Sequence, residues 1–294
     1  MMTLNFANIL TDIEQGTFKE EYLDFLGEDI DDEKAIKLAQ ALMYNPYIKR
    51  INLSNKNIGD EGAKALAAVK TIQELDLSNG LSGYDEYENH ITAIGVQALA
   101  NSNLKKLLLN GNPIGNKGIK LLAKNKTIID LEVSDCDITN EGAAELFSIN
   151  TAIQNLNLRA NNIDDNSLIA ICLNKTLLYL DLSCCQITNH GLELLAQNNC
   201  IKNINLNDNK ITNEGIKVLI KKNSSIEYLS VNGCEVYYDE SLKITLKDNI
   251  ALKEMCMSYD KYKKFDAMQQ DLKRKIEDGV NEQENKYPKF SISG

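Results

Sequence analysis

The chain has 294 residues, 43% of them hydrophobic, and its 42 acidic against 32 basic residues give a formal net charge of −10. This length and apolar content allow one large domain or two small ones, whereas the acidic balance argues against nucleic-acid binding, which needs a basic surface. No apolar run approaches the ~18 residues of a membrane span, and the N-terminal stretch lacks the cationic start and long apolar segment of a signal peptide. We therefore expect a soluble protein, monomeric on its own, whose partner is a protein with a basic surface.

The seven cysteines are an odd number without CxxC spacing, and neither His90 nor His190 lies at ligand spacing from a cysteine pair. Cys184 and Cys185 are adjacent, a spacing that closes a disulfide only with strain. Reduced thiols are therefore expected, with no metal site and no cofactor.

Residues 1–22 precede the first repeat and are predicted to form an N-terminal cap. From residue 23 to residue 262 the pattern L-x-L-x-x-N/C-x-I recurs in about ten units, at steps of 24 to 32 residues. A period in this range is typical of a solenoid, whose units bury their apolar faces by stacking. The first aliphatic residue of each unit, called the anchor, is Leu23, Ile51, Leu75, Leu107, Leu131, Leu156, Leu180, Ile204, Leu229 or Met255.

Each unit is predicted to begin with a short strand. The anchor and the residue two positions later point inward, because side chains alternate along a strand. The residues one before the anchor and one, three and four after it are predicted to be exposed. Five after the anchor, a buried amide or thiol is expected to bond the backbone of adjacent turns. The residues at this position are Asn112, Cys136, Asn161, Cys185, Asn209 and Cys234.

In most units a glycine and a helical stretch follow the strand, as in IGDEGAKALA (58–67) and ITNEGAAEL (138–146). The pattern predicts an α/β solenoid that curves with a parallel β-sheet on its concave face and helices on its convex face. These stretches resemble leucine-rich repeats of the ribonuclease-inhibitor type, and most of all the short bacterial version called GALA repeats.

This resemblance implies a non-enzymatic protein–protein interaction module, because ribonuclease-inhibitor-type repeats bind proteins and their namesakes fill the active-site cleft of an enzyme. GALA-repeat proteins are similar to effectors that bacteria inject into eukaryotic cells. The resemblance thus implies a partner in the host or another bacterial effector, and a path from the bacterial cytoplasm, through type IV secretion, to the host cytosol. Two alternatives stay open: a ubiquitin-ligase adaptor, although residues 1–22 lack an F-box start, and a GTPase activator that uses Arg159.

The step from Leu75 to Leu107 is the longest, at 32 residues, which indicates an insertion at 80–88, GLSGYDEYE. This segment leaves the C-terminal edge of a strand beside the exposed positions. Because it carries Tyr84 and Tyr87, we expect it to contact a partner. The alternative is a tolerated surface insertion, since long loops cost little free energy.

The predicted exposed strand positions carry nine acidic residues, Asp24, Glu74, Asp76, Asp130, Glu132, Asp135, Asp181, Asp208 and Glu254, against three basic ones, Arg50, Lys106 and Arg159. A concave surface of one sign attracts an oppositely charged partner, and the alternative is an ordinary solvated face. Large side chains at these positions, which favour interface contact, are Tyr22, Leu108, Tyr179, Tyr228 and Tyr259. The predicted partner-binding residues are Glu74, Asp76, Tyr84, Tyr87, Leu108, Asp130, Glu132, Arg159, Tyr179, Asp181 and Tyr228.

Residues 263–294 are predicted to form a capping helix and a flexible tail. Phe265, Met268, Leu272 and Ile276 follow helical spacing, whereas NEQENKYPKFSISG has the low hydrophobicity of a disordered segment. The acidic tail resembles C-terminal translocation signals of type IV effectors, and a frayed terminus is the alternative.

Overall fold

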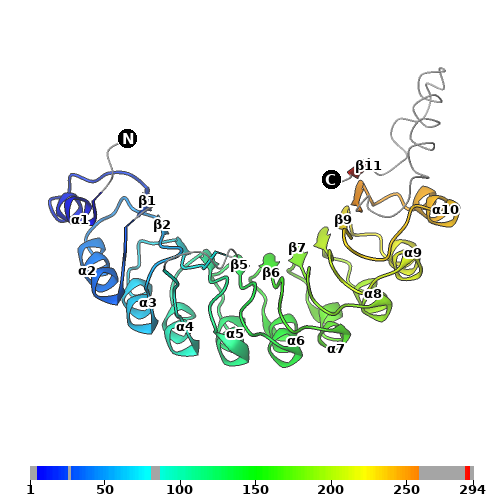
Figure 1. The fold of residues 1–294 in the computed structure, drawn as a ribbon, viewed down its shortest axis with the longest axis horizontal. Helices are drawn as coiled ribbons and strands as arrows, with labels where there is room; N and C mark the ends of the chain where they lie inside the picture. Colours follow the sequence, from blue (N-terminus) through cyan, green and yellow to red (C-terminus); the bar gives the residue numbers. More distant parts are fainter. Residues whose placement is uncertain (1–4, 26–27, 81–86, 258–288, 292–294) are drawn as a thin grey trace, which may run out of the picture. The chain divides into compact units, whose positions relative to one another are not determined.

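Short strands form at the anchor positions and helices follow them along the chain (Figure 1). The computed structural model describes residues 5–25, 28–80, 87–257 and 289–291. Contacts divide the chain into two units, Met1–Ile163 and Asp164–Gly294, called unit 1 and unit 2.

In unit 1 the strands are parallel neighbours in chain order, and their anchors pair in register from Leu23 to Leu156. The helix α1, within the predicted N-terminal cap, buries Phe6, Ile9 and Ile13. The described strands of unit 1 are β1 (Tyr22–Asp24), β2 (Arg50–Asn52), β3 (Glu74–Asp76), β4 (Lys106–Leu108), β5 (Asp130–Glu132) and β6 (Asn155–Asn157). Its described helices are α1 (Phe6–Glu14), α2 (Asp32–Leu42), α3 (Asp60–Ala67), α4 (Ala93–Leu99), α5 (Gly115–Ala123) and α6 (Asn140–Ile149).

Unit 2 continues the same alternation with parallel strands in chain order. The described strands are β7 (Tyr179–Asp181), β8 (Asn203–Asn205), β9 (Tyr228–Ser230), β10 (Glu254–Cys256) and β11 (Lys289–Ser291). Its described helices are α7 (Asp165–Leu168), the 3-10 helix η1 (Ile171–Leu173), α8 (Asn189–Leu195), α9 (Asn213–Lys222) and α10 (Glu240–Asp248).

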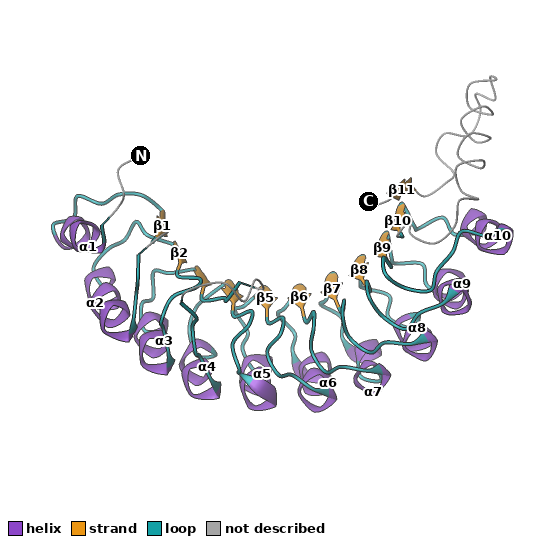
Figure 2. Ribbon diagram, viewed as in Figure 1, coloured by secondary structure: helices purple, strands orange, loops and turns teal. Residues whose placement is uncertain are grey.

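Within each unit the strands lie on the concave side and the helices on the convex side (Figure 2). The core lies between these layers. The anchors and the residues two positions later are buried, and Leu75, Leu77, Leu107 and Leu109 are each 0% exposed. The predicted α/β solenoid with parallel strands is thus confirmed.

The strand β11 corrects one prediction. The last residues were expected to be disordered, but Lys289–Ser291 pairs in parallel with β10, where Glu254 faces Lys289 and Cys256 faces Ser291. An edge strand offers unpaired N–H and C=O groups, which an extended segment can satisfy whatever its hydrophobicity. The predicted capping helix lies outside the described residues.

The asparagine five positions after the anchor joins neighbouring turns, as predicted. Asn112 Nδ2 donates to Leu77 O at 2.9 Å and to Leu109 O at 3.1 Å, and Asn112 Oδ1 accepts from Ile91 N at 2.9 Å. Cys136 takes the same position with its thiol, 3.1 Å from Leu109 O, and burial raises the pKa of this thiol to about 12. The interpretation of these residues as structural is confirmed.

A second polar contact, which the sequence analysis did not identify, joins neighbouring helices. Asp60, the first residue of α3, accepts hydrogen bonds at 2.8 Å from Thr92 N and Gly95 N, at the start of α4. A Cβ on Gly95 would lie 2.7 Å from Asp60 Oδ1, too close for any side chain. Glycine at position 95 therefore leaves room for the Asp60 carboxylate, which caps α4 from the preceding helix.

Candidate protein-binding face

The strand face of unit 1 presents two parallel rows of side chains, because the residues on both sides of each anchor point away from the core. The register places neighbours in a row on adjacent strands, which lie about 4.8 Å apart. The upstream row, one residue before each anchor, is Tyr22, Arg50, Glu74, Lys106, Asp130 and Asn155. The downstream row, one residue after each anchor, is Asp24, Asn52, Asp76, Leu108, Glu132 and Asn157.

The upstream row carries as many basic as acidic residues. Basic and acidic residues alternate from Arg50 through Glu74 and Lys106 to Asp130, and Lys106 Nζ lies 3.1 Å from Asp130 Oδ2. Partial burial by itself would lower the pKa of Lys106, but the hydrogen bond to Asp130 and nearby carboxylates outweigh it, so the pKa is raised. Arg50 lies over the Tyr22 ring, with its guanidinium carbon 5.5 Å from the ring centre. This row therefore carries little net charge.

The downstream row is acidic, and its carboxylates make no direct ion pair with the described residues. Asp24, Asp76 and Glu132 occupy alternate strands, and in the described part of the chain no lysine or arginine nitrogen lies within 4.0 Å of their oxygens. Neutral groups donate hydrogen bonds to these carboxylates instead. Asp24 Oδ2 accepts from Tyr22 Oη at 3.0 Å, Asp76 Oδ1 from Ser78 N at 2.9 Å, and Glu132 Oε2 from Asn110 Nδ2 at 2.9 Å. Three carboxylates on one line therefore lack a direct ion pair, although Lys106 acts on Glu132 and Lys56 on Asp24 from a greater distance.

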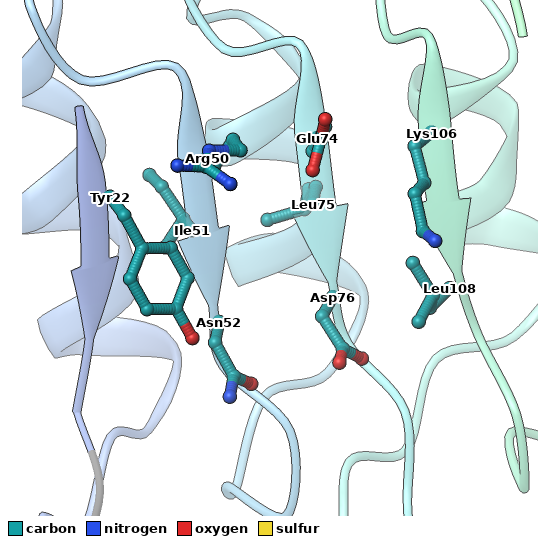
Figure 3. A pocket seen from close by; sticks show the side chains of 9 residues that line it. All are labelled: Tyr22, Arg50, Ile51, Asn52, Glu74, Leu75, Asp76, Lys106 and Leu108. Carbon is teal, nitrogen blue, oxygen red and sulfur yellow. The ribbon is translucent and has the colours of Figure 1, made fainter.

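A hollow lies over β1 to β4, between and across the two rows (Figure 3). The buried anchors Ile51 and Leu75 lie at its base, and half-buried Leu108 lines it beside Lys106. Its other lining residues are Tyr22, Arg50, Asn52, Glu74 and Asp76. The hollow thus combines apolar, acidic and basic contacts, which suits a peptide or protein surface better than one small apolar ligand.

The predicted insertion leaves the solenoid beside this hollow, at the downstream end of β3. Asn79 and Asn89 flank it and bind each other, because Asn79 Nδ2 donates to Asn89 O at 2.8 Å and Asn79 Oδ1 accepts from Asn89 N at 2.6 Å. Tyr87 is half-buried, whereas Tyr84 and the rest of 81–86 lie outside the described residues. The expected partner contact of the insertion stays a prediction.

Asp181 does not lie where the sequence analysis placed it. Its side chain in β7 is buried, with 6% exposure, and its carboxylate accepts from Ser183 Oγ at 2.6 Å and Asn205 Nδ2 at 2.7 Å. The prediction that Asp181 is an exposed contact residue is wrong, because neighbouring polar side chains cover it. On the same face of unit 2, Tyr228 is 42% exposed and Tyr179 is half-buried, with its hydroxyl 3.3 Å from Asp181 Oδ2.

The position three after the anchor also differs from expectation. Ser78, Ser134 and Ser183 at this position are buried, and the backbone N of each donates to a side-chain oxygen of the strand face. Arg159, at the same position after β6, is half-buried, and its backbone N donates to Asn157 Oδ1 at 2.9 Å. Within unit 1 the structure therefore brings together Glu74, Asp76 and Leu108 around the hollow and continues the rows to Asp130 and Glu132.

Sequence analysis missed the difference between the two rows, although its signal was present. The alternation of charge in the upstream row is lost when all charges of the face are added. It appears when the residue before the anchor is compared from unit to unit.

In the described residues, no group of three or more His, Cys, Asp or Glu side chains is arranged to hold a metal ion. No helix in the described part is long and apolar enough to cross a membrane.

The family described as Leucine Rich repeat matches six stretches, residues 44–67, 100–123, 124–147, 150–172, 173–196 and 197–219. The human protein "NACHT, LRR and PYD domains-containing protein 2" is 31% identical over 124 residues, which cover 37% of this chain and 11% of that protein. The chain thus spans about a tenth of the length of this relative.

Among solved structures, internalin C2 from Listeria monocytogenes is similar with a TM-score of 0.52 and 20% identity, over 74% of this chain and 83% of that one. An internalin (inlF) from the same species has a TM-score of 0.54 and 18% identity, over 82% of this chain and 68% of that one. At such identity the likeness concerns the fold alone. The repeat matches show that six stretches of this chain belong to leucine-rich repeats, and such repeats typically serve as non-enzymatic scaffolds for protein–protein interaction.

Proposed function

We propose that the chain is a non-enzymatic binding module whose strand face in unit 1 takes up a protein partner with a basic surface. The observation that carries this proposal is the downstream row, where, among the described residues, Asp24, Asp76 and Glu132 have no cation within 4.0 Å, while the upstream row carries as many basic as acidic residues and pairs Lys106 with Asp130. Carboxylates without a direct ion pair on a concave face attract cations and speed association with a positively charged partner. Leu108 and Tyr22, in the same hollow, add apolar and aromatic contact area.

The proposal extends to what binding does. By filling or covering a site on its partner, the module inhibits or regulates that partner, as the resemblance to ribonuclease-inhibitor-type repeats suggests. The resemblance to GALA repeats supports action as a bacterial effector within a host cell. A translocation reporter fused to the chain, in bacteria with and without a type IV secretion system, tests this part: a signal that needs the secretion system supports it, and no signal in either strain contradicts it.

Charge-neutral variants of the row test the binding site. The triple variant Asp24→Asn/Asp76→Asn/Glu132→Gln removes three negative charges from the downstream row. The matched control Glu14→Gln/Glu33→Gln/Glu61→Gln removes three from exposed positions of α1, α2 and α3, on the helix side. Both are used as bait for affinity capture, and the affinity of the partner captured by the parent chain is then measured by calorimetry.

Capture should fail, or affinity should fall about tenfold or more, for the row variant and stay near the parent value for the helix-side control, because exposed ion pairs contribute up to ~1 kcal/mol each. Equal losses of affinity in both variants would show that only the overall charge of the chain matters, and not the downstream row. Unchanged capture by the row variant, with an unchanged melting temperature, would refute the proposed face.

A further inference from the structure

The carboxylates of the downstream row have a regular spacing. Asp24 lies on β1, Asp76 on β3 and Glu132 on β5, and the register places them on one line across the strands. With adjacent strands about 4.8 Å apart, successive carboxylate-bearing residues are separated by about 9.6 Å. The residues between them, Asn52 and Leu108, are uncharged.

A partner chain that crosses the strands along this row needs a cation every ~9.6 Å on one side. A polyproline II segment has three residues per turn and rises about 3.1 Å per residue, so every third side chain returns to the same side after about 9.3 Å. In an extended β-strand, side chains two or four residues apart lie on the same side, about 6.6 Å or 13 Å from each other. In an α-helix, side chains seven residues apart lie on the same side, about 10.5 Å from each other. The spacing of the polyproline II repeat is the nearest to the spacing of the row. The larger mismatch of the other conformations doubles between the first and the third carboxylate.

Ser78 supplies an independent observation in the middle of the row. Its side chain is buried, with 8% exposure, and its hydroxyl has no hydrogen-bond partner, although its backbone N donates to Asp76 Oδ1 at 2.9 Å. Serines at the same position of other repeats do form hydrogen bonds: Ser54 Oγ donates to Asn52 Oδ1 at 2.8 Å, and Ser183 Oγ to Asp181 Oδ1 at 2.6 Å. A buried hydroxyl without a partner costs free energy. The Ser78 oxygen is enclosed in this conformation, so an external acceptor beside Asp76 relieves that cost once the side chain rotates towards it.

Polyproline II backbone fits this unused donor, because it makes no internal hydrogen bonds and its carbonyl groups remain free to accept one. From the spacing, the absence of direct ion pairs to the three carboxylates in the described residues, and Ser78, we infer that the downstream row binds an extended polyproline II segment of a partner protein with Lys or Arg at every third position. The cations contact Asp24, Asp76 and Glu132, and the intervening residues contact Asn52 and Leu108. This inference rests on the proposed function and specifies the partner of the same face.

Peptides of equal charge and different spacing test it directly. The first is three repeats of Pro-Pro-Lys, which holds polyproline II conformation and places lysine at every third position. The second is proline-rich, of the same length, with three lysines at every second position. The third is an alanine-rich helical peptide with three lysines seven residues apart. Affinities for the full chain are measured by fluorescence anisotropy at low salt.

The first peptide should bind about tenfold more tightly than either of the others, since a mismatched spacing loses one or two of three exposed ion pairs. The preference should disappear in Asp24→Asn/Asp76→Asn/Glu132→Gln and persist in Glu14→Gln/Glu33→Gln/Glu61→Gln. Ser78→Ala, which removes the hydroxyl without a charge change, should weaken the first peptide more than the second. Melting temperatures of all variants verify that each remains folded.

Equal affinity for the three peptides, or tightest binding of the helical one, would overturn the inference. If the captured partner still depends on the row while the peptides are not distinguished, the proposed function stands and the polyproline II segment is refuted. If neither partner nor peptides respond to the row variant, both proposals fail.

Discussion

Asn79 and Asn89 bind each other across the inserted segment, with Asn79 Nδ2 2.8 Å from Asn89 O and Asn89 N 2.6 Å from Asn79 Oδ1. Asn89 also donates to Leu53 O at 2.9 Å and Leu77 O at 3.0 Å, which are the contacts that the asparagine five after the anchor makes in other units. The repeat therefore resumes at Asn89 as though the insertion were absent. The two ends of the insertion are held together by the solenoid itself.

Deletion of Gly80–Glu88 should leave the solenoid folded. It joins Asn79 to Asn89 and places Asn79 four residues after the anchor, where Asn55, Asp135 and Ala160 have φ values of 52°, 52° and 55°. Asparagine tolerates this left-handed conformation. The melting temperature, followed by circular dichroism, should change by no more than a few degrees, whereas partner affinity should fall because Tyr84 and Tyr87 are lost. A deletion variant that no longer unfolds cooperatively would contradict this account, and Tyr84→Ala/Tyr87→Ala separates the side chains from the loop.

Asn161→Ala should lower stability and not recognition. Asn161 Nδ2 donates to Val133 O at 2.8 Å and Leu158 O at 3.0 Å, and Oδ1 accepts from Cys136 N at 3.1 Å and Ile138 N at 3.0 Å. Removal of the amide leaves buried backbone groups unbonded, at a cost of about 1–3 kcal/mol in the free energy of unfolding. Urea titration measures the loss. The exposed Asn103→Ala serves as the control and should be neutral; a variant at Asn161 that melts like the parent but fails to bind would reverse the assignment.

Gly95→Ala should be destabilising although alanine favours helices. The added Cβ would lie 2.7 Å from Asp60 Oδ1 and 3.1 Å from Asp60 Cα, so the Asp60 carboxylate must leave its hydrogen bonds to Thr92 N and Gly95 N or helix α3 must shift slightly. A cost of about 1–3 kcal/mol is expected for such overpacking. In the double variant with Asp60→Ala the two losses should not add, because the clash and the hydrogen bonds involve the same carboxylate. Strict additivity in urea unfolding would show that the two residues act independently.

Cys136 should resist alkylation in the folded protein. Burial raises the pKa of its thiol to about 12, and the thiolate is the reactive form, so little of it exists at about pH 8. Half-exposed Cys172 should react before Cys136 with iodoacetamide, as judged by peptide mass spectrometry.

The same burial predicts how stability depends on pH. In the unfolded chain the thiol of Cys136 titrates near its ordinary pKa of 9.0, so the free energy of unfolding is unaffected below that pH and declines above it, because only the unfolded state releases the proton. Cys136→Ala should flatten that decline; early modification of Cys136 would contradict the burial.

Association with the captured partner should slow as salt rises. The carboxylates of the downstream row act on a distant basic surface through screened Coulomb attraction, and the Debye length shortens from about 30 Å at 0.01 M to about 8 Å at 0.15 M salt. Stopped-flow association rates across this range should fall several-fold, with a smaller change in the dissociation rate. The row variant should show a weaker salt dependence. Flat rates for the parent chain would exclude electrostatic attraction by this face.

The repeat period, the anchors and the buried Asn or Cys could all be predicted from sequence, because each depends on local alternation of side chains and on one pattern repeated many times. The same reasoning located the insertion, since Asn89, Ile91 and Gly95 restore the frame. Exposure and charge compensation were decided by tertiary structure, because they depend on neighbours one strand away. Lys106 pairs directly with Asp130 and not with Glu132, and Asp181 is covered by Ser183 and Asn205. The strand at Lys289–Ser291 forms for the same reason: the bonds that hold it are supplied by β10, whose paired residues lie 35 positions earlier in the chain, and not by its own composition.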